Sequence, residues 1–143
     1  MPKLTVELVT AEREVLKQEA DIVIAPATDG TIGILPRHAP LVTTLNPGVM
    51  TLRNDGEEQV LSVSGGFLQV FRDRVLILAD AAERSDEVDE ERADAARQRA
   101  EAALREAQRR PGGSLQAEAA RTALRRSLVR LDVVRRRKRR ANP

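Results

Sequence analysis

The sequence has 143 residues and a net charge of +2, which is enough for one ordinary domain or for a small domain with an appendage. It contains no cysteine and one histidine, His38, which excludes a disulfide framework, a Cys–His catalytic pair and a multi-histidine metal site. No stretch approaches about 18 apolar residues, and the first residues lack the apolar core of a signal peptide, so we expect neither a membrane span nor a leader. The charge is uneven, because residues 1–84 carry 8 basic and 12 acidic side chains whereas residues 85–143 carry 16 and 10.

The first 84 residues have the pattern of short β-strands. Apolar and polar residues alternate at residues 4–9, and the turn-forming residues Asn54, Asp55 and Gly56 separate two apolar runs, as in a hairpin. Arg72 and Asp73 indicate a second tight reversal. We predict strands at residues 4–9, 15–16, 22–24, 49–53, 59–64, 67–71 and 74–79. Many short strands separated by turns indicate an antiparallel β-sandwich or a barrel over residues 1–84.

Several prolines and glycines interrupt this pattern. Pro36, Pro40 and the pair Pro47-Gly48 are expected to break the chain between strands. The pair Gly65-Gly66 lacks the strand–loop–helix context of a phosphate loop, so we interpret it as a β-turn. The core must be aliphatic, since two phenylalanines are the only aromatic residues.

From residue 85 the apolar period changes to that of a helix. Ser85 or Asp86 is the predicted N-cap, and acidic residues follow in the first turn. Pro111, Gly112 and Gly113 must end this helix, and Ser114 can cap a second one that runs to about residue 140. The predicted apolar faces consist of Ala93, Ala96, Ala100, Ala103, Leu104 and Ala107, and of Ala120, Ala123, Leu124, Leu128, Leu131 and Val134. Residues 85–143 should therefore form an antiparallel two-helix hairpin, which makes the predicted fold class α+β.

The arginines of the hairpin are placed symmetrically about its turn. Arg92 and Arg99 share one face of the first helix, and Arg126 and Arg130 share one face of the second. Folding about Gly112 would gather all four near one another, where each pair at about 8 Å costs about 0.5 kcal/mol in water and about 2 kcal/mol at an effective dielectric of 20. A seam of alanines gains little from packing, so we expect a hairpin that closes with a bound polyanion and loosens without it. The alternative is that these arginines belong to a solvated charged face.

The run of six cations at residues 135–140 is a second electrostatic feature. Such a run is typical of a patch for nucleic acid, anionic lipid or an acidic protein, and the alternative is a solvated helix end. No aromatic residue is interleaved with it, so stacking on bases has no support. His38 lies on a predicted loop between prolines, and the sequence contains no plausible pair of nucleophile and base, which argues against a small enzyme.

Three motifs resemble the epsilon subunit of F-type ATP synthase. They are GTIGILPRHAPLVTTLNPG at residues 30–48, LSVSGGFLQV at residues 61–70 and ILADAAERSDEVDEERA at residues 77–93. The resemblance implies a β-sandwich that binds the gamma subunit and the ring of c subunits in the central stalk, on the cytoplasmic face of the cell membrane and peripheral to it. It also implies that the chain is not an enzyme, since the catalytic sites of the complex lie on the beta subunit, and that no metal or nucleic acid is required. The ring-facing loop would include Thr31, Arg37 and His38, where family members often carry Glu in place of Thr31 and Gly in place of Arg37.

The resemblance also implies a regulatory role for the hairpin. In the family a compact hairpin permits turnover, whereas an extended one enters the alpha/beta head and opposes ATP hydrolysis. Some members bind ATP in the compact hairpin through an Ile/Leu-Asp-x-x-Arg-Ala motif, which corresponds here to residues 88–93. The implied ATP-binding residues are Glu83, Val88, Asp89, Arg92, Ala93, Arg99, Arg126 and Arg130. The basic run would meet an acidic loop on the beta subunit. The rival interpretation, a separate nucleic-acid-binding module, explains neither the loop motifs nor the glycines.

Overall fold

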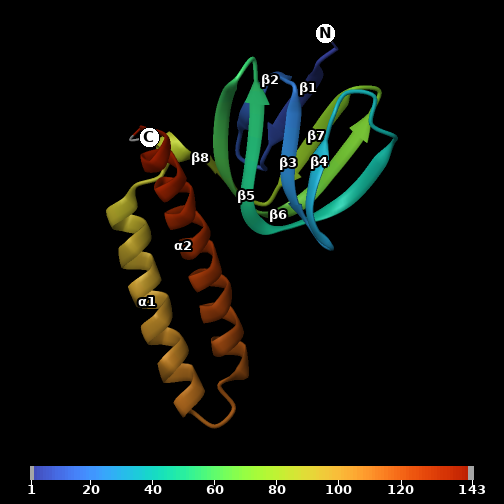
Figure 1. The fold of residues 1–143 in the computed structure, drawn as a ribbon. Helices are drawn as coiled ribbons and strands as arrows, with labels where there is room; N and C mark the ends of the chain where they lie inside the picture. Colours follow the sequence, from blue (N-terminus) through green and yellow to red (C-terminus); the bar gives the residue numbers. More distant parts are fainter. Residues whose placement is uncertain (1, 142–143) are drawn as a thin grey trace. The chain divides into compact units, whose positions relative to one another are not determined.

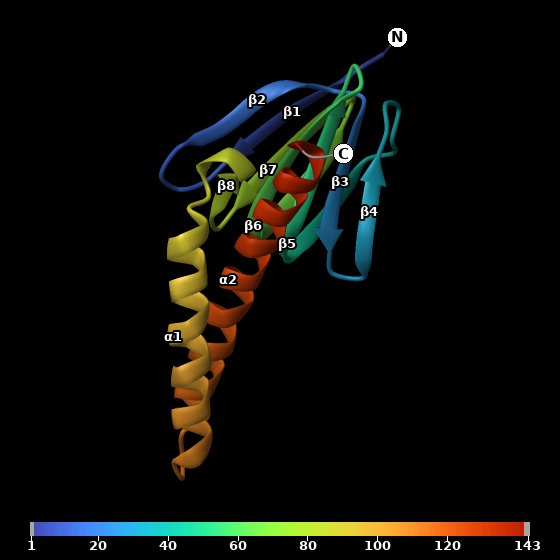
Figure 2. The ribbon, with the colours of Figure 1, turned by 60° about the vertical axis from the view of Figure 1, so that its left-hand side comes forward.

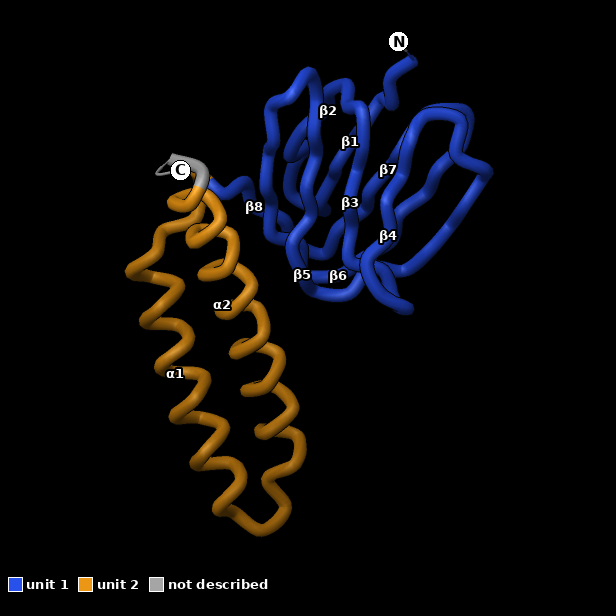
Figure 3. The backbone as a smooth tube through the Cα atoms, in the orientation of Figure 1, with its two compact units in different colours: residues 1–85 blue, residues 86–143 orange. Residues whose placement is uncertain are grey.

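The structure of the protein is a computed structural model, which describes residues 2–141 and the side chains of residues 2–139. Its described part contains eight strands, a short 3-10 helix and two α-helices (Figure 1). The strands are β1 (Leu4–Val9), β2 (Glu14–Ala20), β3 (Ile22–Ala27), β4 (Gly30–Ile34), β5 (Leu41–Asn54), β6 (Glu57–Phe71), β7 (Arg74–Ala79) and β8 (Ala82–Arg84). The helices are η1 (Ser85–Glu87), α1 (Glu90–Arg109) and α2 (Ser114–Ala141). The chain divides into two compact units, Met1–Ser85 and Asp86–Pro143, which Figure 3 colours separately.

The first unit is built on one continuous strand order, β2-β1-β7-β6-β5-β3-β4, with β8 paired to β6. All pairs are antiparallel except β1 with β7, which run parallel. Strand β6 pairs with β5 along one side. On its other side the partner changes along the strand, since residues 61–63 pair with β8 and residues 66–71 pair with β7. The long strands β5 and β6 therefore contribute to both layers of the sandwich. This unit and the two helices after it confirm the predicted α+β class.

Two predicted chain breaks are wrong. Pro47 lies inside β5, where it is paired with Ser64, and Gly65 and Gly66 lie inside β6 instead of forming a turn. The glycines adopt positive φ angles of 105° and 127°, which let the strand bend where it passes between layers. A Cβ atom on Gly66 would lie 2.1 Å from the carbonyl oxygen of Leu78, so only glycine fits this position. The bend is an in-strand feature that looks like a turn in the sequence.

The remaining predictions for the first unit are confirmed in part. The hairpin at Asp55-Gly56 is confirmed, with φ angles of 51° and 82°, and so is the reversal at Arg72-Asp73, with 49° and 60°. Strand β4 was not predicted, because Gly30 and Gly33 indicated a loop. The core is aliphatic as expected, apart from Met50, and both phenylalanines are exposed at the surface.

The second unit is the antiparallel helix pair α1 and α2 (Figures 1 and 2). The predicted N-caps are wrong. Ser85–Glu87 form a separate 3-10 turn, and α1 is capped by Asp89, whose carboxylate accepts a hydrogen bond from the N–H of Arg92 at 3.2 Å. In α2 the N–H of Ala117 bonds to the carbonyl of Gly113, so Gly113 occupies the cap position that was predicted for Ser114. Among the described residues, no helix is long and apolar enough to cross a bilayer.

Candidate functional site

The two helices of the hairpin meet through small side chains. The buried residues of α1 are alanines spaced seven apart, and the described buried residues of α2 include two more alanines and a serine. These residues are Ala93, Ala100, Ala107, Ala117, Ala120 and Ser127, and toward its C-terminal end α2 also buries the larger residues Leu131, Val133 and Val134. The predicted alanine seam is therefore present, although Ala103 is exposed and Leu128 is 47% exposed. A seam of this kind brings the backbones close but removes little apolar area from water.

A groove of about 530 Å³ runs between the helices alongside this seam. Its floor consists largely of alanine methyl groups, and three arginines line it: Arg99 from α1, and Arg126 and Arg130 from α2. The remaining lining residues are Ala96, Ala100, Ala103, Gln116, Ala119, Ala120, Ala123 and Ser127. Three of the four arginines that were predicted to gather are thus in one groove.

The other predicted ligand residues lie outside the groove lining. Arg92 is exposed on the first turn of α1, almost two turns from Arg99. Val88 and Ala93 are buried, at 4% and 0% exposure, and Asp89 is the helix cap, so all three have structural tasks at the start of α1. Glu83 is on β8 in the first unit. The prediction that these residues bind ATP stays a prediction.

The charge of the groove is determined by its arginines. None of its lining residues is acidic, and Arg99 and Arg126 are exposed while Arg130 is half-buried. Guanidinium groups present forked N–H donors that match phosphate oxygens two at a time. The donor set therefore fits a polyanion with several phosphates. It does not fit a metal ion, and no group of three or more potential ligands is placed to hold one in the described part of the chain.

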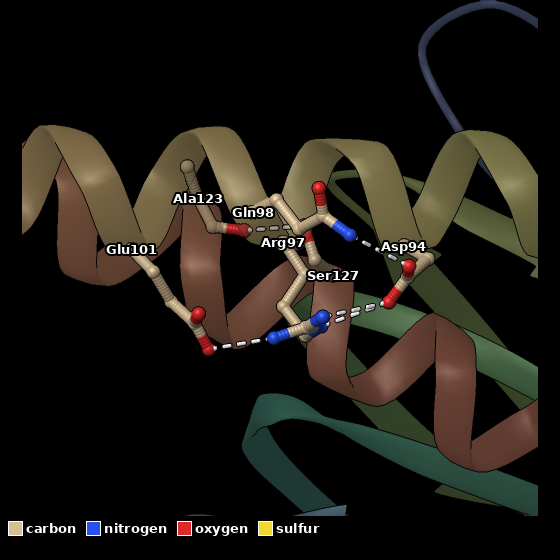
Figure 4. Close-up of polar contacts among 6 residues, drawn as sticks. All are labelled: Asp94, Arg97, Gln98, Glu101, Ala123 and Ser127. Atoms are coloured by element: carbon tan, nitrogen blue, oxygen red, sulfur yellow. Dashed lines mark hydrogen bonds and ion pairs between the residues drawn. The ribbon is translucent and has the colours of Figure 1, made fainter.

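Sequence reasoning missed two polar groove residues, Gln116 and Ser127. Ser127 is only 4% exposed, and its hydroxyl donates to the carbonyl of Ala123 at 2.9 Å (Figure 4). The position of Ser127 could have been predicted from the sequence, because it lies seven residues after Ala120 and therefore on the buried face of α2. A hydroxyl at this position lines the groove with a polar group that an alanine would not supply.

One nearby arginine differs from those in the groove. Arg97 is bound to Asp94 at 2.9 Å and to Glu101 at 2.9 Å, one turn on either side of it in α1 (Figure 4). These two hydrogen bonds raise the pKa of the Arg97 guanidinium above its usual value. Because its charge is already matched within the helix, Arg97 is a poor candidate for anion binding, even though it lies only two residues from Arg99.

The predicted ring-facing loop belongs to the first unit. Thr31 is exposed on β4, and Arg37 is exposed with a φ of 68°, a conformation that favours glycine. The backbone N–H of Arg37 donates to the Asp73 carboxylate at 2.6 Å, which attaches the loop to the β6–β7 turn. His38 is half-buried, and its Nδ1 lies 2.7 Å from the carbonyl oxygen of Ala39.

The outer face of β5, β6 and β7 carries an unusual concentration of exposed apolar side chains. Val42, Phe67, Phe71 and Leu78 are 71%, 55%, 49% and 50% exposed. Phe67 pairs directly with Leu78, and the strand register places all four side chains on one face. We call these four residues the apolar face. Neighbouring exposed apolar residues of this kind are typical of protein interfaces.

The basic run lies at the end of α2. Residues 135–139 are within the described part of the helix, whereas the side chain of Arg140 lies outside it. Arg136 pairs with Asp132 at 3.4 Å, and Lys138 pairs with Glu90 of α1 at 2.6 Å. The run is therefore helical, and part of it is bound to acidic side chains of the same unit.

Comparisons with known proteins agree with this architecture. A family model described as the beta-sandwich domain of the ATP synthase delta/epsilon chain matches residues 3–85, and one described as its long alpha-helix domain matches residues 86–135. An ATP synthase epsilon chain of Herpetosiphon aurantiacus is 47% identical over 137 residues, covering 96% of this chain and 98% of the relative. Another, from Moorella thermoacetica, is 52% identical over 132 residues and covers 92% and 96%.

The fold is also similar to that of a chain in solved mitochondrial ATP synthase from Euglena gracilis. The TM-score is 0.76 at 22% identity, over 90% of this chain and 79% of the other. The family models and the close relatives confirm the resemblance that the motifs at residues 30–48, 61–70 and 77–93 indicated. The chain belongs to the family of ATP synthase epsilon chains.

Proposed function

We propose that the chain is a non-catalytic subunit of the central stalk, which couples rotation to ATP synthesis and restrains ATP hydrolysis through its helical hairpin. Its partners would be the gamma subunit, the c-ring and, with the hairpin extended, the alpha and beta subunits. The complex would hold it peripherally on the cytoplasmic face of the cell membrane. Family membership supports this assignment, and so do the descriptions of similar solved structures as parts of an F1/c-ring assembly and of a central stalk with its c-ring.

The docking part of the proposal is supported by the first unit. The apolar face offers a large partner four exposed side chains that would be removed from water on binding, at about 25 cal/mol for each Å² buried. It is the surface we assign to the gamma subunit. The loop at Thr31, Arg37 and His38 is the segment we assign to the c-ring.

The regulatory part rests on one observation, the convergence of Arg99, Arg126 and Arg130 on the groove between α1 and α2. Three like charges oppose closure of a hairpin whose alanine seam gains little from packing. A bound triphosphate reverses that balance, since each guanidinium then donates to anionic oxygens. ATP would accordingly act as a regulatory ligand that keeps the hairpin compact and the enzyme complex active.

The basic residues 135–139 are the part of the hairpin that we assign to the beta subunit. In an extended hairpin they would lie far along a helix of 28 residues, which at 1.5 Å per residue spans about 40 Å. Their charge suits an acidic surface on the beta subunit. This contact would strengthen the inhibited state, more so at low salt.

Calorimetric titration of ATP into the isolated full chain tests the groove. We expect saturable heat with ATP, weaker heat with inorganic triphosphate and none with adenosine, together with chemical-shift changes at Ser127 and its neighbours. Calorimetry suits this chain because it has no tryptophan to report binding by fluorescence. No heat and unchanged hairpin shifts at about millimolar ATP would refute ATP sensing, with the stalk assignment left intact.

A further inference from the structure

The open end of the hairpin, where α1 begins and α2 finishes, is joined by an ion pair. Nζ of Lys138 lies 2.6 Å from a carboxylate oxygen of Glu90. Figures 1 and 2 show that α2 continues past the first turn of α1 at this end. The contact therefore ties the last turns of α2 to the start of α1, more than two turns away from the arginines of the groove.

The charges around this pair are matched in number and opposite in sign. The segment 86–91 of the second unit contains five carboxylates, and residues 135–139 are five consecutive cations. Helix dipoles favour the same arrangement, since anions are stabilised at the N-terminus of α1 and cations at the C-terminus of α2. We call the first segment the acidic start and the second the basic end.

We propose that the acidic start competes, within the same chain, with an acidic protein partner for binding to the basic end. In the closed hairpin the basic end is held by the acidic start through Lys138 and Glu90. An acidic partner can bind the basic end fully only when that pair separates. The hairpin thus carries a second restraint on its opening, one that responds to ionic strength and to acidic surfaces and needs no nucleotide.

The restraint is weak enough to act as a switch. The side chains of Lys138 and Glu90 are 59% and 46% exposed, so water and salt screen their attraction. Exposed pairs of this kind shift an equilibrium by about two- to five-fold, and the surrounding matched charges act in the same direction. A stronger pair would hold the hairpin closed against its partner, and a repulsive one would leave it open.

Charge exchange in the isolated full chain, without ATP, tests the pair. The chain has no cysteine, so spin labels can be attached at Gln98→Cys and Leu128→Cys, both exposed, and the distance between them reports closure. We expect Lys138→Glu to lower the ratio of closed to open hairpin by about five-fold or more, and Lys138→Glu with Glu90→Lys to restore it. Arg135→Glu, which makes the same charge change at an exposed neighbour with no ion pair among the described residues, is the matched control.

The response to salt separates this contact from a general loss of helix stability. From about 0.01 M to about 1 M salt the Debye length falls from about 30 Å to about 3 Å. Across this range the ratio of closed to open hairpin in the unsubstituted chain should fall relative to that in the Lys138→Glu variant, because salt screens an attraction in one and a repulsion in the other while the groove arginines are common to both. Equal opening by Lys138→Glu and Arg135→Glu, or no recovery in the exchanged variant, would overturn the proposal. Lys138→Gln repeats the comparison if the reversed variant loses helical circular dichroism.

Competition is measured with poly-L-glutamate as the acidic probe. Glu90→Gln should tighten its binding by about two- to five-fold, since the basic end no longer has its internal partner. Glu118→Gln removes the same charge near the other end of the hairpin and should leave binding unchanged. Equal affinities for Glu90→Gln and the unsubstituted chain would contradict the competition. These measurements involve neither ATP nor the assembled complex, so their failure would leave the proposed function standing.

Discussion

Replacing Arg126 by alanine should change closure of the hairpin in opposite directions with and without ATP. Arg126 shares the groove with Arg99 and Arg130, and packed helices lie about 8–10 Å apart. At about 8 Å each like-charge pair costs about 0.5 kcal/mol in water, the appropriate medium because Arg126 and Arg99 are exposed. Of these pairs only Arg126 with Arg99 forms on closure, because Arg130 lies on α2 with Arg126. Removing Arg126 should therefore stabilise the closed, ligand-free hairpin by about 0.5 kcal/mol, which is about a two-fold shift.

With ATP present, Arg126→Ala should instead make the hairpin close less. A hydrogen bond between a guanidinium and a phosphate contributes about 1.5–3 kcal/mol, so the Arg126→Ala variant should bind ATP about 10- to 100-fold more weakly. Calorimetry gives the affinity, and the distance between labels on α1 and α2 gives closure at low salt. Arg125→Ala is the control, since it removes an equal charge from an exposed position outside the groove. Unchanged affinity, or equal losses for both variants, would refute the assignment of Arg126 to the ligand.

Three further predictions concern the first unit, and each is checked by urea unfolding followed by circular dichroism. Gly66→Ala should lower the free energy of unfolding by at least about 3 kcal/mol, because its Cβ would lie 2.1 Å from the Leu78 carbonyl; a smaller loss would mean that the strands shift easily. Arg37→Gly should raise it by about 0.5–1 kcal/mol, since glycine adopts a φ of 68° without strain, and a loss would show that the side chain is needed. Asp21 and Lys3 form an ion pair at 2.6 Å in which the pKa of Asp21 is lowered and that of Lys3 is raised, each chiefly by hydrogen bonding. The stabilisation by Asp21 should therefore disappear as the pH falls below about 4, and that by Lys3 as the pH rises above about 10. In the Lys3→Met variant the free energy of unfolding should depend less on pH in both ranges, and the same pH dependence in both chains would contradict this.

The turns and the helix pair could be predicted because their causes are local. Asp55-Gly56 adopts the positive φ angles that a two-residue hairpin requires. Pro111 favours the extended conformation of Arg110, which ends the first helix at Arg109. The bend of β6 could not be predicted in this way. Its cause is the carbonyl of Leu78 on a neighbouring strand, and a glycine pair in isolation is equally typical of a turn.

The candidate site likewise has features that could be predicted from the sequence and features that could not. The spacing of Arg99, Arg126 and Arg130 follows from helical geometry, so their convergence could be predicted from the sequence. The cap at Asp89 could not, because several acidic residues in succession are equally good candidates and burial of Val88 depends on tertiary packing. The pairing of Lys138 with Glu90 depends on how far α2 extends past α1, which requires the exact length of both helices.

Regulation by the hairpin is tested most directly by the ATPase activity of the assembled alpha–beta–gamma complex. The chain is supplied either complete or truncated after Gly113, which removes α2 with its two groove arginines and its basic end but leaves the sandwich. We predict that the truncated chain still joins the complex and that ATP hydrolysis is faster than with the complete chain. Equal rates with both forms, at equal occupancy in the complex, would contradict the account.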